Sequence, residues 1–297
     1  MGIFFYIDDK LIDFQNPTSL VKDDYRKYFG RRELEPFLLS EICALDMLYA
    51  VTEMNNGYYK DRLVLKGGHS VRNHVPLVDH RFSFDADFNP NSPGGFTFGD
   101  VSDIRKDLNK YGSLRGCETK TRITEDSAML HFIEVGYRSV LSKLGYTIIE
   151  PPKIEICKTC RTHERPIMSE MKTMIDLNLL GLKPLVLAHL SLEEQLANKL
   201  HVIGARGRQR NNFDAYDVYR ICKNNKVDWK KTKGIFDAIV TKSGKKPSDY
   251  IAECRRQLDT MLSNERKQIN LTNVIFDSGS FDFKSMISDV KSRYDFH

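Results

Sequence analysis

The apolar residues of the chain follow two periods, and the clearest period of two lies at residues 81–88. Four apolar side chains alternate there with four polar ones: Phe82, Phe84, Ala86 and Phe88 against Arg81, Ser83, Asp85 and Asp87. Successive side chains of a β-strand point to opposite faces, so this pattern predicts a strand with one apolar and one charged face. A short apolar run at residues 63–65 predicts another strand before it.

Other segments have apolar residues at helical spacing, and we predict helices at residues 36–54, 100–112 and 126–144. Residues 117–124 and 153–157 are predicted strands. Residues 89–95 contain two prolines and two glycines, a composition that predicts a loop after the charged strand.

The pattern changes to helix and basic charge from about residue 185. Ser191 and Glu194 have the spacing of a capping box, which predicts that a helix begins there. Its buried stripe consists of Leu192, Leu196, Leu200 and Ile203. Residues 222–297 are also predicted to be helical, with an apolar face that includes Trp229 and Phe236.

Composition excludes some classes of protein. The chain has 297 residues, 41% of them hydrophobic, and a net charge of +5, with no apolar run near the roughly 18 residues that span a membrane. The N-terminal run Ile3–Ile7 is too short for the apolar region of a signal peptide. We therefore expect a cytoplasmic protein without membrane partners, whose six scattered cysteines are reduced.

The charged strand face suggests metal chemistry. Asp85 and Asp87 are two residues apart, so their side chains lie roughly 7 Å apart on one face and suit divalent cations. Upstream, Gly67 and Gly68 allow backbone amides to approach an anion as the chain turns into a helix. A phosphate cradle followed by paired carboxylates is what a metal-dependent phosphoryl or nucleotidyl transferase needs. The alternative is that both acids are solvated surface residues.

These motifs resemble those of a known family. A Gly-Gly turn followed by D-x-D is similar to the pattern of the DNA polymerase β-like nucleotidyltransferase superfamily, although the gap from Gly68 to Asp85 is longer here. Lys66-Gly-Gly-His-Ser70 together with Arg81-Phe-Ser-Phe-Asp85-Ala-Asp87 more closely resembles the AbiEii/AbiGii nucleotidyltransferase toxins of bacterial phage-defence and toxin–antitoxin systems.

A second signature of that family is matched at residues 191–219. Lys199 matches the family lysine thought to contact the triphosphate, and Asp214 and Asp217 match a D-x-x-D pair. Phe213 stands where the family usually has arginine, and residues 211–212 look like an insertion. A second register would place Asn211 and Asp214 at the two acidic positions; the spacing of the aromatic residues favours Asp214 and Asp217.

The resemblance implies an α+β protein in which residues 1–184 form a nucleotidyltransferase domain with a small mixed sheet and residues 185–297 form a helical domain. It implies transfer of a nucleoside monophosphate from an NTP to an acceptor, with Asp85 and Asp87 holding Mg²⁺ and Lys199 and Asp214 assisting. Glu155 is a candidate third metal ligand, or equally a solvated strand acid. The expected nucleotide-binding residues are Lys66, Gly67, Gly68, Ser70, Arg81, Ser83 and Lys199.

Charge distribution suggests the acceptor. Residues 199–246 contain 13 Lys and Arg against 4 Asp and Glu, an excess of 13 − 4 = 9. Arg206, Arg208 and Arg210 are the expected RNA contacts, although a solvated basic helix would look the same. By resemblance the acceptor is RNA, first of all a tRNA 3′ end, and the protein is a toxin of a toxin–antitoxin or abortive-infection system, with a cognate antitoxin.

Three other possibilities remain at this stage. A metal-dependent phosphodiesterase or nuclease would use the same carboxylates, but it needs no triphosphate cradle. An inactive RNA-binding module of the same fold would need no D-x-D. Cys157, Cys160 and His163 have spacing typical of zinc ligands, but a structural zinc site has four ligands and no second pair follows.

Overall fold

A computed structural model describes most of the chain, and its contacts divide into two compact units. It describes residues 6–7, 10–11, 17–29, 34–53, 57–91, 96–113, 119–123, 130–135, 152–157, 162–180, 182–204, 210–276 and 281–297. Unit 1 comprises Met1–Ser70, Phe82–Thr162 and Pro166–His189, and unit 2 comprises Val71–Arg81, His163–Arg165 and Leu190–His297.

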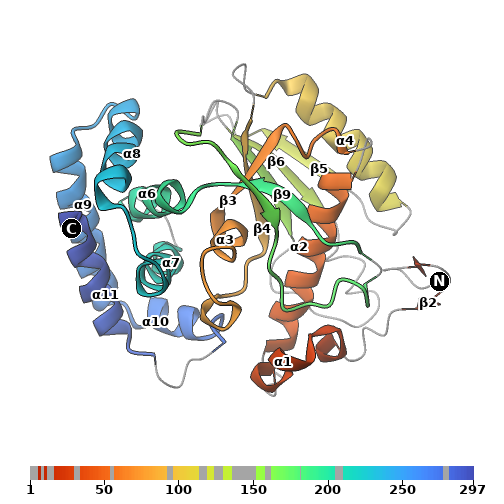
Figure 1. Ribbon diagram of the computed structural model, residues 1–297, viewed down its shortest axis with the longest axis horizontal. Helices are drawn as coiled ribbons and strands as arrows, with labels where there is room; N and C mark the ends of the chain where they lie inside the picture. The colour runs from red at the N-terminus through yellow and green to blue at the C-terminus, as the bar shows by residue number, and fades with distance from the viewer. Residues whose placement is uncertain are drawn as a thin grey trace. The chain divides into compact units, whose positions relative to one another are not determined.

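Unit 1 is built on a mixed seven-stranded sheet with the strand order β5-β6-β7-β4-β3-β9-β8 (Figure 1). The strands are β3 (Leu63–Lys66), β4 (Asp85–Pro90), β5 (Thr119–Ile123), β6 (Leu130–Val135), β7 (Lys153–Cys157), β8 (Ile167–Glu170) and β9 (Val186–His189). The central strand β4 pairs antiparallel with β3 and parallel with β7. The first two strands, β1 (Tyr6–Ile7) and β2 (Lys10–Leu11), form a separate hairpin.

Two long helices, α2 (Glu35–Glu53) and α4 (Phe98–Ser113), contact each other and pack against strands of the sheet (Figure 1). This packing explains why apolar and polar residues alternate in the charged strand. Ala86 and Phe88, on its apolar face, are fully buried, and α2 contacts β4. Just before β4, Phe82 and Phe84 stack on Phe37 of α2 with ring centroids 5.8 and 6.0 Å away. Unit 1 also contains the short helices η1 (Pro17–Leu20), α1 (Asp23–Arg26), η2 (Lys27–Phe29) and α3 (Gly67–Val71, whose last residue is in unit 2).

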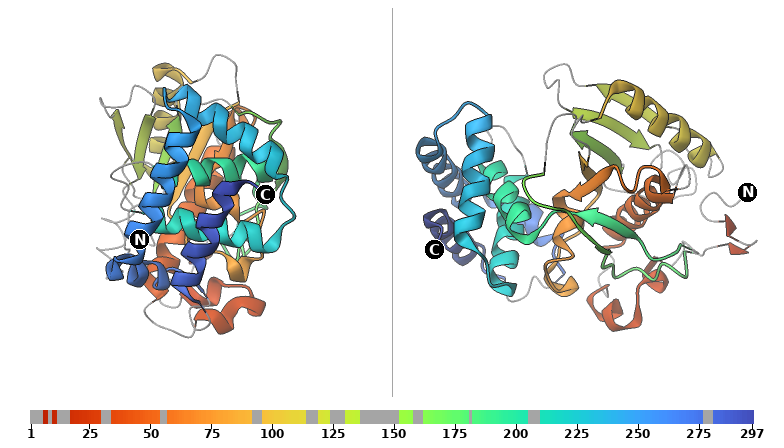
Figure 2. Two further views of the ribbon diagram at one scale, coloured as in Figure 1. Left: turned by 90° about the vertical axis from the view of Figure 1, so that its left-hand side faces the viewer. Right: turned by 45° about the horizontal axis from the view of Figure 1, so that its top comes forward.

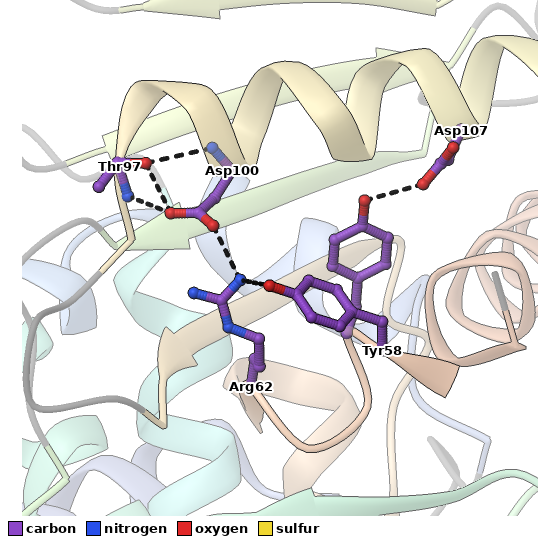
Figure 3. A network of polar contacts seen from close by, with 6 residues as sticks. Tyr58, Arg62, Thr97, Asp100 and Asp107 are labelled. Atoms are coloured by element: carbon purple, nitrogen blue, oxygen red, sulfur yellow. Dashed lines mark hydrogen bonds and ion pairs between the residues drawn. The ribbon is translucent and has the colours of Figure 1, made fainter. Parts of the chain in front are cut away.

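The start of α4 is held by a polar network (Figure 3). The Thr97 amide donates to Asp100 Oδ2 at 2.8 Å, and the Asp100 amide donates back to Thr97 Oγ1, which satisfies two donors at the helix terminus. The Arg62 guanidinium donates to Asp100 Oδ1 and to the Tyr58 hydroxyl. Burial alone would raise the pKa of Asp100, but the hydrogen bonds from Thr97 and Arg62 lower it.

Unit 2 is helical in the residues that the structure describes (Figure 2). Its long helices are α6 (Leu192–Ile203), α7 (Asn211–Asn224), α8 (Trp229–Lys242), α9 (Pro247–Leu262), α10 (Glu265–Thr272) and α11 (Phe283–Ser292), and it also contains η5 (Leu77–Asp79) and η6 (Arg293–Asp295). Helix α6 packs on α7 and α8, and α11 packs on α7 and α9. Ser191 accepts a hydrogen bond from the Glu194 amide, so the predicted cap of α6 is confirmed.

The observed elements confirm the α+β class and most predicted segments. The helix predicted at residues 126–144 is wrong, because residues 130–135 form β6, paired with β5 and β7. Their apolar run is too short for periodicity to separate a strand from a helix, and it is rich in residues that favour strands. The loop predicted from residue 89 begins later, because β4 continues through Pro90. Pro90 stands at the end of the strand, where a missing amide is tolerated.

The structure also bears on the state of the cysteines. Cys157 is disulfide-bonded, so the expectation that all cysteines are reduced is wrong, whereas Cys43, Cys222 and Cys254 are free.

The predicted domain boundary between residues 184 and 185 stays a prediction. The contact-defined units divide near it at His189, but unit 2 also contains residues 71–81.

Candidate functional site

The charged side chains of unit 1 lie in register across three central strands. Asp85 pairs with Lys153 and Asp87 with Glu155 across the parallel strands β4 and β7. On the other side of β4, Asp87 pairs with Lys66 of β3. Register partners share a face of the sheet. Three carboxylates and two ammonium groups therefore share one face, while Ala86 and Ile154, on the opposite face, are fully buried.

Lys153 is a site residue that the sequence analysis did not single out. Its Nζ lies 2.8 Å from Glu155 Oε1 and 3.8 Å from Asp85 Oδ2. Burial alone would raise the pKa of Glu155, but the hydrogen bond and charge of Lys153, the charge of Lys66 and a hydrogen bond with Asp87 lower it. Glu155 is therefore ionised at neutral pH and belongs to the same cluster as both aspartates.

The glycine turn packs directly against the acidic strand. Gly67 has φ of +69°, a region that favours glycine, and a Cβ added there would overlap Asp87 Oδ2 and lie 2.8 Å from Asp87 Cγ. Only a residue without a side chain fits between the turn and Asp87. Gly67 and Asp85, at which the two motifs begin, are 85 − 67 = 18 residues apart in sequence. The two motifs are nevertheless adjacent within unit 1.

Other residues expected to bind nucleotide are buried. Ser70 is fully buried, and Ser83 is 5% exposed, with its amide donating to Glu41 Oε2 of α2 at 3.2 Å. Arg81 belongs to unit 2, where its guanidinium binds both oxygens of Asp217 at 3.0 and 2.9 Å. The predicted outward-facing polar row of the strand is therefore exposed only in part.

Lys199 lies in a buried ion cluster of unit 2. Its Nζ is 2.8 Å from Asp214 Oδ1 and 2.6 Å from Asp217 Oδ2, and Asp217 also holds Arg81. Burial alone would lower the pKa of Lys199, but the two carboxylates raise it. Two cations and two anions balance, so a buried cluster of this kind is electrically satisfied. Asn211, which the second register places at the first acidic position, accepts a hydrogen bond from Lys267.

The segment 71–81, between the glycine turn and the acidic strand, is tied to α7 at several points. Arg220 Nη1 lies 2.7 Å from Asp79 Oδ1, and Asn225 Nδ2 donates to the His74 carbonyl at 2.7 Å. Together with the Arg81–Asp217 pair, these contacts make α7 the element that carries both this segment and the D-x-x-D residues.

The expected RNA contacts lie mostly outside the described residues. This is true of Arg206 and Arg208, whereas Arg210 stands half-buried at the N-cap of α7. The Cys160 of the cysteine–histidine segment also lies outside them, and His163 belongs to unit 2.

A magnesium ion fits the donor chemistry of the charged face. Asp85, Asp87 and Glu155 offer the carboxylate oxygens that Mg²⁺ prefers, held in register on adjacent strands. Within the described part of the chain, no group of three or more His, Cys, Asp or Glu side chains is arranged as a metal site. Two of the three carboxylates, Asp85 and Glu155, contact the Lys153 ammonium instead, at the distances given above.

Comparisons with known proteins give the family of the chain and its fold. The family model described as "Nucleotidyl transferase AbiEii toxin, Type IV TA system" matches residues 50–288. A solved structure of MenT4, a nucleotidyltransferase toxin from Mycobacterium tuberculosis, is similar with a TM-score of 0.62 and 18% identity, covering 91% of this chain and 87% of that one. That likeness shows the fold alone. No curated protein matches the chain. In the described residues, every helix is too short or too polar to cross a membrane.

Proposed function

The chain belongs to the AbiEii nucleotidyltransferase toxin family of type IV toxin–antitoxin systems, and from this premise we propose that it transfers a nucleoside monophosphate from an NTP to an RNA and releases pyrophosphate. The observation that carries the proposal is the packing of Gly67 against Asp87. It makes one site of the glycine turn and the D-x-D strand, which a nucleotidyltransferase needs for the triphosphate and for its metal.

Unit 1 supplies the reaction centre in this proposal. Asp85, Asp87 and Glu155 hold the divalent cation, which supplies positive charge to the triphosphate when bound. The backbone amides of Gly67 and Gly68 orient the β and γ phosphates, and the buried Ser70 supports the turn from behind. Lys66, whose register partner is Asp87, provides a positive charge beside them.

Lys199 and Asp214 are assigned to the same reaction by the family resemblance. In support of a joint role, Asp214 fixes the position of the Lys199 ammonium at 2.8 Å. Arg81 then acts through Asp217, because its guanidinium donates two hydrogen bonds to that carboxylate. Ser83 acts as a strand-positioning residue, through its amide bond to Glu41.

The acceptor in this proposal is an RNA, first of all a tRNA 3′ end, held by Arg206, Arg208, Arg210 and the lysines that follow. The charge excess of residues 199–246 supports a polyanionic acceptor. The reaction takes place in the cytoplasm, where it stops growth until a cognate antitoxin counters it.

The test is a transfer assay. Pure protein is incubated with each labelled NTP, Mg²⁺ and total RNA, and label in RNA is measured beside RNA length. We expect label in RNA with one NTP, and its loss in Asp85→Asn and Asp87→Asn proteins that remain folded. Shortened RNA without label would indicate a nuclease instead. RNA binding without either change would indicate an inactive binding module.

A further inference from the structure

The charged face of β4 and β7 carries three carboxylates, Asp85, Asp87 and Glu155, and their negative charge needs counter-ions. Asp87 and Glu155 are register partners on adjacent strands, and like charges placed directly opposite each other destabilise a sheet. Asp85 adds a third carboxylate on the same face, two residues before Asp87. Lys66 stands opposite Asp87, and the Lys153 ammonium contacts the other two carboxylates, Glu155 and Asp85.

The position of Lys153 is set by the backbone. It stands two residues before Glu155 on β7 and opposite Asp85 of β4, so its side chain emerges on the acidic face between two carboxylates. Its side chain is 28% exposed, against 20% for Asp85 and 29% for Glu155. The ammonium is thus held within the cluster and still has access to water, which allows it to leave.

Asp85 and Glu155, which Lys153 contacts, are two of the three carboxylates that would hold a divalent cation in the proposed site. Mg²⁺ and Mn²⁺ take carboxylate oxygens in a tight octahedral shell, which leaves no room for an ammonium at the same atom. We propose that Lys153 is an internal counter-ion that holds Asp85 and Glu155 in the metal-free protein and must be displaced when a divalent cation binds. This inference rests on the proposed metal site. It adds that Lys153 lowers the affinity of that site for metal, because it competes for two of the carboxylates.

The experiment compares Lys153→Met with wild type in two measurements made without NTP. The first is Mn²⁺ binding, followed by the electron paramagnetic resonance of the free ion. We expect the Kd of Lys153→Met to fall roughly fivefold, because no partly exposed ion pair has to be broken before the metal binds. The second is the melting temperature in EDTA, which we expect to fall by about 2–4 °C, because the carboxylates lose their counter-ion.

Matched variants separate this inference from its alternatives. Lys106→Met removes a lysine that forms a 3.0 Å ion pair on α4 of the same unit, and it should change neither measurement. Glu155→Gln added to Lys153→Met should restore part of the melting temperature, because it removes one of the two carboxylates that lose their ammonium partner. If Lys153→Met leaves the Kd for Mn²⁺ unchanged or raises it, the counter-ion role is overturned.

Failure of the metal site itself gives a different result. If Asp87→Asn binds Mn²⁺ as wild type does, or wild type binds none, the proposed metal site is wrong. The melting experiment in EDTA still decides on Lys153 in that case, because it needs no metal. An unchanged melting temperature of Lys153→Met would then overturn the counter-ion role as well.

Discussion

Gly67 is the residue at which the two motifs of unit 1 meet. Its positive φ and its contact with Asp87 are two separate reasons for glycine, and one substitution changes both. Gly57 provides a control in the same unit. It has φ of +79°, but a Cβ added there would meet only the Thr52 carbonyl oxygen, at an ordinary 3.7 Å.

We predict that Gly67→Ala abolishes NMP transfer and that Gly57→Ala does not. Both variants should lose about 1 kcal/mol or more of unfolding free energy, because alanine is disfavoured at positive φ. In Gly67→Ala the new methyl group also displaces the Asp87 carboxylate, so activity should fall at least 100-fold. Denaturant unfolding and the transfer assay check the two parts. Equal activity losses in both variants would mean that backbone strain alone explains the effect.

Lys199 presents a choice between a catalytic and a structural role. We predict that Lys199→Met lowers the unfolding free energy by about 3 kcal/mol, because it leaves Asp214 and Asp217 buried with one cation fewer. At a temperature where the variant is folded, kcat should fall and the KM for NTP should rise, because a charge on the phosphates acts in both ground and transition states.

The control for Lys199 is the double variant Lys199→Met with Asp214→Asn. Removing one buried carboxylate should recover part of the stability and none of the activity. Lys199→Arg should not restore activity fully, because a planar fork replaces a compact ammonium. Reduced stability with unchanged kinetics would assign Lys199 a structural role only.

Single residues could be predicted from sequence where a motif or a short period marks them. The motifs pick out Gly67 and Asp87, and the structure brings these two residues into contact. Lys153 lies on the same strand face as Glu155, two residues before it. That lysine was missed because its contact with Asp85 depends on the pairing of β7 with β4. Arg81 and Asp217 are 136 residues apart, and no local pattern predicts such a pair.

Elements were predictable where they are long or capped. Helix α2 was predicted within one residue at each end, since its apolar positions recur over five turns. Strand β6 was missed because its six residues, LHFIEV, are compatible with either period, and its state is decided by pairing with β5 and β7. Helix α4 was predicted from its periodicity, and the structure adds the cap that starts it.

The cap of α4 leads to a prediction about pH. Asp100→Asn should lower the unfolding free energy by about 1 kcal/mol at pH 7, because it weakens the bonds to Thr97 and Arg62. The pKa of Asp100 is lower in the folded protein than its ordinary value of 3.8, so its stabilisation is present above pH 3.8 and is lost as the pH falls through the folded pKa.

Unfolding curves of wild type and Asp100→Asn at several pH values test this. The difference between them should begin to shrink below about pH 4 and should vanish once the pH has fallen through the folded pKa of Asp100, because both side chains are then neutral. Asp103→Asn is the control on the same helix, because its ion pair with Lys106 is 63–68% exposed and should contribute little. A difference that stays constant down to acid pH would contradict the assigned role of the Asp100 charge.

The two units of the molecule are not consecutive segments of the sequence. It leaves unit 1 after Ser70 and returns at Phe82, so the segment between the two reaction motifs belongs to unit 2. A boundary drawn from composition near residue 185 cannot show this, because the segment is recruited by contacts such as Arg220 with Asp79. The helical character of unit 2 was predictable, and this crossing was not.

The structure also refines the basic charge of residues 199–246. Lys199 and Arg220 are buried and balanced by carboxylates, and Lys231 and Lys233 are paired with Glu164 and Asp237. Among the described residues of this segment, the charge excess that can meet an RNA is therefore smaller than the sequence count, and exposed lysines contribute to it. Lys223, Lys226 and Lys230 are exposed and close in sequence, at the end of α7 and the start of α8.

We predict that replacing Lys223, Lys226 and Lys230 together by Gln weakens RNA binding and flattens its salt dependence. Each phosphate contact contributes a slope of about −0.7 in a plot of log affinity against log salt for single strands, so three lost contacts should reduce the slope by up to about 2. The control replaces Lys106, Lys110 and Lys183 of unit 1, which removes the same net charge and should leave the slope unchanged. Both triple variants should bind NTP as wild type does. If both triple variants flatten the salt dependence equally, RNA binding responds to the overall charge of the protein and not to this surface. An RNA affinity that is constant between about 50 and 200 mM salt would exclude a phosphate-binding surface on either unit.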